Sequence, residues 1–257
     1  ALAMRSASLL ARGYRPSGET SASMTETVWG THTVQNLILD DLGAQRATGE
    51  FPPRDEAIAV NVGGKGSVTA DGKSFDLGTR DMIYVGMGTA DIVFASADEA
   101  SPAKFYLLSA PAHQTHPTKH IRIDDAKRID LGSQATSNER SIFQFIHPEG
   151  VKTCQLVVGM TTLAPGSIWN TMPPHLHERR MEAYCYFDLS DEDRVMHFMG
   201  RPDNTRHLVV ANGDVVLSPA WSIHMGAGTG PYGFVWGMTG ENQEYTDVSP
   251  VAIKELR

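Results

Sequence analysis

The sequence predicts an all-β protein built from two similar barrels or sandwiches. Short apolar or alternating runs, rich in Val, Ile, Tyr and Phe, recur from residue 33 onward between Gly, Asp, Asn and Pro. Few windows keep a helical period over three turns, and short strands at this spacing are typical of sandwiches and barrels. A weak internal repeat divides these strands into two modules of one kind.

Composition limits the functions that are open to this chain. Its 257 residues allow one large domain or two modest ones. With 41% hydrophobic and 20% charged residues, the chain can bury a core without staples. A formal net charge of -8 argues against a nucleic-acid partner, and no apolar run is long enough for a transmembrane helix. Two cysteines, Cys154 and Cys185, form no disulfide framework, so we expect a cytoplasmic protein.

Residues 1–32 are expected to form an N-terminal arm. The segment 1–24 is rich in Ser, Ala and Arg, and Glu19 is its only acidic residue. A transit peptide is the alternative, but the apolar stretch around Leu9 and Leu10 is too short for a secretory signal. We therefore interpret this segment as a loosely ordered arm.

The first module is expected at 33–130 and the second at 140–250, with a tail to 257. The polar, turn-rich segment RIDLGSQATSNERS (128–141) is the predicted boundary. In the first module Asp71-Gly72 is a typical hairpin turn. The candidate strands of that module lie in the runs 57–64, 66–72, 82–88, 90–97 and 103–110.

The internal repeat compares one residue of each module directly. Thr89 lies 11 residues after Gly78, and His224 lies 11 residues after Gly213. Each stretch has an Asp shortly after the Gly, in GTRDMIYVG and NGDVVLSPA, before a strand-like run. Because Thr89 replaces the histidine and no His-x-His precedes it, we expect the first module to lack a metal and to serve packing and assembly.

Residues able to bind a metal gather in TMPPHLHERRMEAYCYFDL (171–189). His175 and His177 are two residues apart, so on a strand both imidazoles project from one face. Glu182 opens the next strand-like run, and His224 follows 42 residues later. Three neutral imidazoles and a carboxylate inside a small barrel suit a divalent transition metal with positions open for water or substrate. The alternative is a pair of ordinary strand histidines with exposed rings.

Two motifs resemble the signature of the cupin superfamily of double-stranded β-helical barrels. They are H-x-H-x4-E and, after it, G-x5-P-x-(G)-x2-H, with Trp221 where Gly is commoner. More narrowly, residues 57–257 resemble the 5-keto-4-deoxyuronate isomerase family, whereas residues 1–56 depart from it. The stretches that carry this likeness are VGGKGSVTADG, PAKFYLLSAPAH, PPHLHERRMEAYCYFDL, GRPDNTRHLVV, LSPAWSIHMGAGT and FVWGMTGENQ.

The resemblance implies a two-cupin homo-oligomer, a hexamer, with one zinc ion per chain in the C-terminal barrel. Mn2+ and Fe2+ remain alternatives to zinc. The family's metal ligands fall on the four residues that the spacing selects, which are His175, His177, Glu182 and His224.

Three residues are candidates for contact with the substrate. Arg179 and Arg180 follow the His-x-His pair, and a guanidinium offers two parallel donors to the carboxylate of a uronate. A solvated turn or a subunit contact is the alternative for both. Tyr186 shares a strand face with Glu182 and is a candidate for the proton relay, with core filling as its alternative. Cys185 is expected to face away from Glu182.

The resemblance implies an aldose–ketose isomerisation of a small ketouronate. 5-Dehydro-4-deoxy-D-glucuronate would become 3-deoxy-D-glycero-2,5-hexodiulosonate in the breakdown of pectin and oligouronides, and a bound cation would stabilise the charge that develops as a proton leaves C2 for C1. The stretches ERRMEAYCYFDL and WGMTGENQ favour this substrate. The alternatives are a 5-deoxyglucuronate isomerase of inositol catabolism, an Fe(II) cupin dioxygenase and a sugar-binding cupin without activity.

Overall fold

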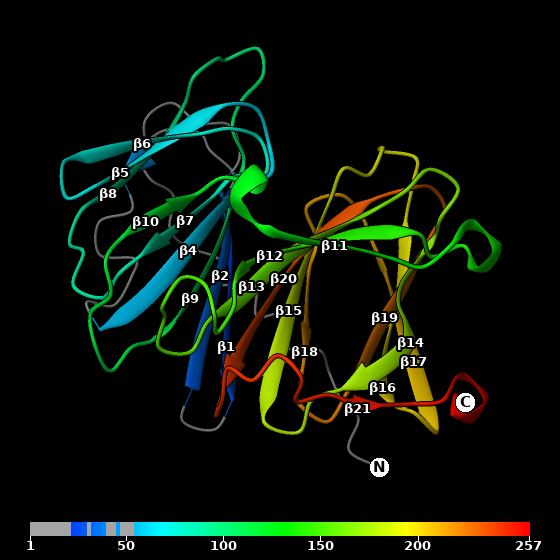
Figure 1. Cartoon of the computed structure of the whole chain (residues 1–257). Helices are drawn as coiled ribbons and strands as arrows, with labels where there is room; N and C mark the ends of the chain where they lie inside the picture. Colours follow the sequence, from blue (N-terminus) through cyan, green and yellow to red (C-terminus); the bar gives the residue numbers. More distant parts are fainter. Residues whose placement is uncertain (1–21, 30–31, 40–44, 47–53) are drawn as a thin grey trace.

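The computed structural model describes residues 54–257 throughout and, before them, the backbone of strands β1 (Ala22–Trp29), β2 (His32–Leu39) and β3 (Gln45–Arg46). Two lobes made of β-strands lie side by side (Figure 1). Within the described residues, three single 3-10 turns accompany the strands, at Ile123–Asp125 (η1), Gln134–Thr136 (η2) and Ile253–Glu255 (η3). In the described part of the chain, no helix is long and apolar enough to cross a membrane. The prediction of an all-β fold is confirmed.

The first barrel consists of two antiparallel sheets, with strand orders β1-β2-β9-β4-β7-β10 and β3-β8-β5-β6. Apolar side chains such as Val68, Phe94 and Phe105 fill its interior. Its other strands are β4 (Asp55–Asn61), β5 (Gly66–Ala70), β6 (Lys73–Leu77), β7 (Met82–Val85), β8 (Ile92–Ser96), β9 (Phe105–Pro111) and β10 (Lys119–Ile121).

A tight hairpin joins β5 to β6 at the predicted turn. Asp71 and Gly72 have φ angles of 44° and 81°. Two successive left-handed residues give the turn whose twist matches antiparallel strands, and Asp-Gly adopts it at little cost. The local sequence therefore sets the register of this hairpin, in which Ala70 pairs with Lys73.

The second barrel also has two antiparallel sheets, with strand orders β11-β12-β13-β20-β15-β18 and β17-β16-β19-β14-β21. Its strands are β11 (Lys127–Leu131), β12 (Arg140–Ile146), β13 (Val157–Leu163), β14 (Trp169–Leu176), β15 (Arg180–Phe187), β16 (Val195–Arg201), β17 (Asn204–Val210), β18 (Val215–Ser218), β19 (Ile223–Gly228), β20 (Gly233–Gly240) and β21 (Ser249–Pro250).

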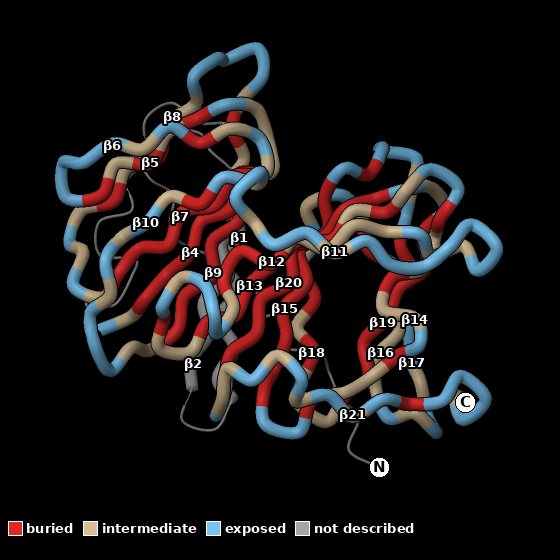
Figure 2. The backbone as a smooth tube through the Cα atoms, in the orientation of Figure 1, coloured by how far each residue is buried: buried red, intermediate tan, exposed pale blue. Residues whose placement is uncertain are grey.

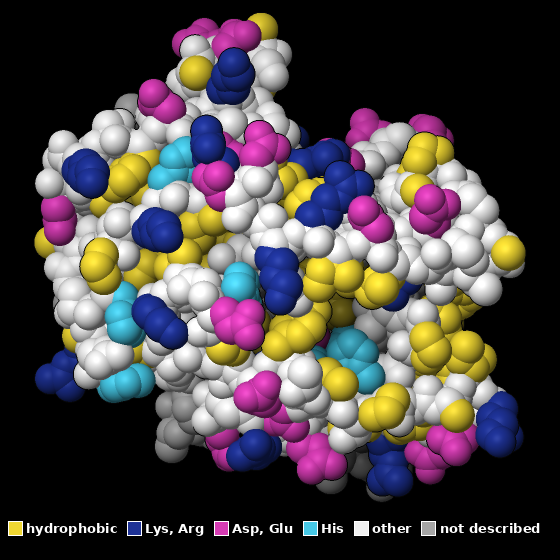
Figure 3. Space-filling model, viewed as in Figure 1, with side chains coloured by type: hydrophobic (Ala, Val, Ile, Leu, Met, Phe, Trp, Pro, Cys, Tyr) yellow, Lys and Arg dark blue, Asp and Glu magenta, His cyan; other side chains and the backbone are white. Residues whose placement is uncertain are grey.

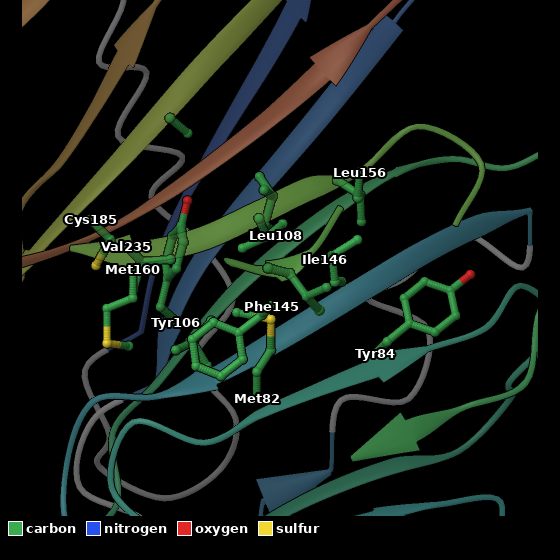
Figure 4. Close-up of a cluster of buried hydrophobic side chains, with 14 of the residues drawn as sticks. Met82, Tyr84, Tyr106, Leu108, Phe145, Ile146, Leu156, Met160, Cys185 and Val235 are labelled. Atoms are coloured by element: carbon green, nitrogen blue, oxygen red, sulfur yellow. The ribbon is translucent and has the colours of Figure 1, made fainter. Parts of the chain in front are cut away.

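A hydrophobic core lies between the two barrels, where β4, β7 and β9 of the first face β13, β15 and β20 of the second (Figure 2). Figure 4 shows Met82 and Tyr106 of the first barrel packed with Phe145, Met160 and Cys185 of the second. Because side chains alternate along a strand, β15 points one face into this core and the other into its own barrel. Cys185 therefore faces away from the barrel interior, as the strand parity predicts.

A buried carboxylate fastens the barrels together. Glu56 on β4 is fully buried and accepts hydrogen bonds from the backbone N–H groups of Cys154, Gln155 and Leu156, at 2.6, 2.7 and 3.0 Å. The hydroxyl of Tyr84 donates a fourth bond at 2.9 Å. These four donors offset the cost of burying the charge and fix the segment that leads into β13.

Two segments differ from the sequence-based expectations. Residues 1–21 of the expected arm lie outside the described residues, whereas its end, Ala22–Trp29, is strand β1 and pairs with β2. The polar segment 128–141, expected as the boundary, contains β11 and the start of β12, which pair in the second barrel. Strand β11 is polar because it is a largely exposed edge strand rather than a linker.

Candidate metal centre

Three strands of the second barrel bring the four predicted ligands together. His175 lies on β14 and His177 follows the end of that strand, while Glu182 lies on β15 and His224 on β19. His175 and His224 are direct cross-strand partners, so their side chains share one face. Strand β15 belongs to the opposite sheet. The site therefore spans the interior of the barrel from sheet to sheet.

The ligand atoms of these four residues all lie within 4.8 Å of one another. Glu182 Oε2 is 3.1 Å from His177 Nε2 and 2.9 Å from His224 Nε2, and His224 Nε2 is 3.1 Å from His175 Nε2. Glu182, His177 and His224 are buried, while His175 is half-buried. Among the described residues, no other group of three or more His, Cys, Asp or Glu side chains converges in this way.

Hydrogen bonding shows that this cluster fits a cation. His177 Nδ1 lies 3.0 Å from the carbonyl oxygen of Asp247, which only accepts, and 3.3 Å from Nη2 of Arg180, which only donates; in the tautomer that donates to Asp247, Nδ1 carries the proton. The lone pair of Nε2 in the same ring then points at the carboxylate oxygen of Glu182, which also only accepts. Two acceptors this close repel each other unless a positive charge lies between them. A divalent ion held by three imidazoles and one carboxylate satisfies all of these lone pairs.

The protonation states suit metal binding as well. Burial, aided by the nearby His224, lowers the pKa of His175 to about 3, so this imidazole is neutral at physiological pH. Burial alone would raise the pKa of Glu182, but the adjacent His224 and His177 outweigh it and hold this pKa well below its usual value. A neutral imidazole and an ionised carboxylate are the forms that bind a metal.

The cluster opens into a cavity of about 340 Å3 inside the second barrel. In Figure 3, histidine side chains are visible beside hydrophobic ones between the two sheets of this barrel. Besides three of the ligands, the cavity is lined by Arg140, Ile142, Thr161, Thr171, Pro173, Tyr184, Phe234, Trp236, Met238, Tyr245, Thr246 and Val248. This size suits a small organic molecule, and the mixture of apolar walls and few polar groups is typical of ligand sites.

The three residues expected to contact substrate lie outside this lining. Arg179 is exposed and pairs with Asp247, with 3.5 Å between Nε and Oδ2. Arg180 is buried, and its Nη2 donates to the carbonyl of Asp247 at 3.0 Å, which places it behind His177. Tyr186 is buried, with its ring near those of the cavity-lining Tyr184 and Phe234, and it hydrogen-bonds to Nδ1 of His197 at 2.7 Å.

The sequence analysis missed Arg140 and the cavity wall formed by Tyr245 and Thr246. Arg140 begins β12 and shares a strand face with Ile142, which also lines the cavity. A charged residue on the inward face of an apolar strand was therefore the signal in the sequence. Tyr245 and Thr246 precede Asp247 in a segment without strand or helix. No local pattern places such a segment, because its position depends on the contacts of Asp247 with His177 and Arg180.

In the first barrel, the residue matched to His224 has a different setting. Thr89 lies in the turn after β7, and its hydroxyl donates to the carbonyl of Gly86 at 2.9 Å. The histidines of 113–120 belong to the connection from β9 to β10 and to β10 itself, where His120 pairs with Asp81 at 3.2 Å. These side chains do not form a ligand cluster within the described residues.

Comparison with known proteins places the chain in a family. The model of the KduI/IolB family matches residues 11–251. The chain belongs to this family. It is 66% identical over 210 residues to "4-deoxy-L-threo-5-hexosulose-uronate ketol-isomerase 2" of Rhizobium meliloti (strain 1021). The aligned region covers 82% of this chain and 74% of that protein. It is 50% identical over 217 residues to "4-deoxy-L-threo-5-hexosulose-uronate ketol-isomerase" of Escherichia coli O8 (strain IAI1). Here the aligned region covers 84% of this chain and 78% of that protein.

Solved structures share the fold of the KduI/IolB chain. An IolB-like protein from Salmonella typhimurium LT2 superposes with a TM-score of 0.73 at 17% identity, over 91% of this chain and 94% of that one. Bacillus subtilis oxalate decarboxylase, described with Mn(II) centers, superposes with a TM-score of 0.61 at 16% identity, over 90% and 75%. The double barrel of the cupin type, predicted from the sequence, is confirmed.

Proposed function

We propose that this chain is a metal-dependent ketol-isomerase that converts 5-dehydro-4-deoxy-D-glucuronate into 3-deoxy-D-glycero-2,5-hexodiulosonate. The observation that carries the proposal is the convergence of three imidazoles and one carboxylate on a cavity of about 340 Å3. The relatives at 50% and 66% identity, whose names state this activity, support the choice of substrate over 5-deoxyglucuronate.

We propose that His175, His177, Glu182 and His224 hold the metal, and that this metal is Zn2+. A divalent ion at these residues supplies a Lewis acid for the adjacent carbonyl and hydroxyl oxygens of the substrate. Mn2+ and Fe2+ accept the same ligands. Elemental analysis of protein purified without chelator distinguishes the three ions.

The other cavity residues orient the substrate and exclude water. Burial raises the pKa of Tyr184 well above its usual value, with Glu182 adding to the effect, and burial also raises that of Tyr245. Both phenols therefore keep their protons and offer O–H donors to sugar oxygens. The apolar walls formed by Phe234, Trp236 and Met238 keep the reacting region dry, which strengthens each electrostatic contact there.

The decisive experiment follows the product by NMR. Metal-replete protein is mixed with 5-dehydro-4-deoxy-D-glucuronate, and 3-deoxy-D-glycero-2,5-hexodiulosonate is expected. Removal of the metal should abolish the conversion, and the same ion should restore it. Conversion of 5-deoxyglucuronate instead would move the chain to inositol catabolism, and substrate-dependent oxygen uptake would indicate a dioxygenase. Binding without turnover would indicate a sugar-binding protein.

We propose further that the chain acts in the cytoplasm as a homohexamer, in the breakdown of pectin-like polymers. Cys154 and Cys185 form no disulfide with each other, which fits a reducing compartment. The hexamer follows from the resemblance to the 5-keto-4-deoxyuronate isomerases, and light scattering on the purified protein would test it.

A further inference from the structure

Among the described residues that line the cavity, Arg140 is the one cationic side chain, Lys or Arg. It stands at the start of β12, two residues before Ile142, and both side chains face the interior of the second barrel. The residue is half-buried rather than spread on the surface. A cation in such a place requires a partner, because burial removes most of its hydration.

The protein supplies only part of that partnership. Arg140 Nη1 donates to the carbonyl oxygen of Asn138 at 2.8 Å. The titratable side chains that act on its charge are the phenols of Tyr232, Tyr245 and Tyr184, and Arg140 forms no ion pair with a carboxylate within the described residues. Burial accordingly lowers the pKa of Arg140, although a guanidinium remains charged at physiological pH. The guanidinium thus faces a cavity with donor capacity that neutral neighbours do not use.

The cavity therefore presents two different recognition groups to one occupant. The ligand cluster suits the carbonyl and hydroxyl oxygens of a sugar, whereas a guanidinium suits a carboxylate, to which it can donate two parallel hydrogen bonds. The rest of the lining is mostly apolar or hydroxyl-bearing, through residues such as Thr161, Trp236 and Thr246. A molecule with a reactive sugar end and an acidic end meets both groups.

We propose that Arg140 binds the carboxylate of a sugar-acid substrate while the opposite end of that substrate lies at the His-Glu cluster. This role rests on the proposed isomerase function and gives it a selectivity for uronates over neutral sugars. It also replaces Arg179 and Arg180 as the carboxylate contact, because one of them is exposed and the other holds Asp247 behind His177.

The test measures binding first, so that it does not depend on turnover. Calorimetry on the metal-loaded protein compares D-galacturonate with D-galactose, which differ by the carboxylate. Wild type should bind the acid at least about tenfold more tightly, and Arg140→Gln should remove that difference. Arg140→Lys should restore part of it, since a lysine keeps the charge without the fork. Arg201→Gln, which alters an exposed arginine on β16, is the matched control.

A second readout separates this inference from the isomerase proposal. With the ketouronate substrate, Arg140→Gln should raise KM at least about tenfold and change kcat less, with metal content and circular dichroism unchanged. Unchanged acid binding and KM in Arg140→Gln would overturn the role of Arg140 and leave the isomerase standing. Arg140-dependent binding of the acid without any isomerisation would keep the role and overturn the isomerase. If Arg140→Gln loses its fold, equal binding of acid and neutral sugar by wild type decides against the proposal.

Discussion

The two barrels use one architecture for opposite purposes. The interior of the first is closed by apolar side chains such as Val68, Phe94 and Phe105. The interior of the second keeps a cavity and buries three of the four predicted ligands at its edge. Buried polar groups are tolerated only where partners satisfy them; the carbonyl of Asp247 is such a partner for His177, and a divalent ion would be one for all four predicted ligands. The difference lies in which residues point inward, while the arrangement of the sheets is shared.

The largest effect is expected from removing the ligand that the first barrel lacks. His224→Ala should leave His175, His177 and Glu182 without the residue that bridges two of them, and activity should fall by more than about 100-fold with loss of bound metal. Circular dichroism should still show a β protein. Thr89→Ala is the matched control in the first barrel and should keep metal and rate. Metal loss in Thr89→Ala rather than in His224→Ala would reverse the roles assigned to the barrels.

The contact between the barrels should matter most for stability. In Glu56→Gln, an NH2 group replaces one carboxylate oxygen that accepts two hydrogen bonds, such as those from the Tyr84 hydroxyl and the Cys154 N–H. These two donors would then point at an NH2 group, which cannot accept from them. We expect the free energy of unfolding in urea to fall by about 3 kcal/mol. Glu149→Gln, whose side chain is 82% exposed, should change it by less than about 0.5 kcal/mol. Equal stability of the two variants would show that the buried carboxylate does not hold the barrels together.

Acid should destabilise the second barrel through His197. Burial lowers the pKa of His197 to about 3, well below the 6.5 of an unfolded histidine. Between these two values the unfolded chain binds a proton that the folded chain does not, so stability falls as the pH drops below 6.5. Urea unfolding of metal-free protein at pH 7, 6 and 5 should show a smaller decline in His197→Gln, by up to about 1.4 kcal/mol per pH unit. His207→Gln, at an exposed position, should follow wild type.

The smallest effect is expected at Tyr186, whose ring lies near that of the cavity-lining Tyr184. Tyr186→Phe removes the hydrogen bond to His197 and should cost about 1 kcal/mol of stability. The kcat should change little, because Tyr186 is fully buried and does not line the cavity. A loss of about 100-fold in kcat would instead support the role in the proton relay that the sequence analysis considered for Tyr186.

The grouping of the ligands was predictable because it depends on short-range rules. Strand parity sets His175 and His177 on one face, and the motif spacing after Gly213 selects His224, which pairs with His175 across two neighbouring strands. Arg140 was not predictable in the same way. Arg140 is far from the cluster in the sequence. Only the strand order β12-β13-β20-β15 of the sheet brings it near, and this order depends on long-range pairing. The role of Glu56 was not predictable for the same reason, since the backbone groups that donate to it lie about a hundred residues away in the sequence.

The carbonyl oxygen of Asp247 joins two parts of the site that are otherwise separate. It accepts from His177 and from Arg180, and the residues just before it, Tyr245 and Thr246, form a wall of the cavity. An ion that fixes the ring of His177 therefore also fixes that wall, and an occupant that orders the wall also orders the ring. If a metal binds at His177 and a substrate binds in the cavity, thermodynamic linkage requires each to change the affinity of the other by the same factor.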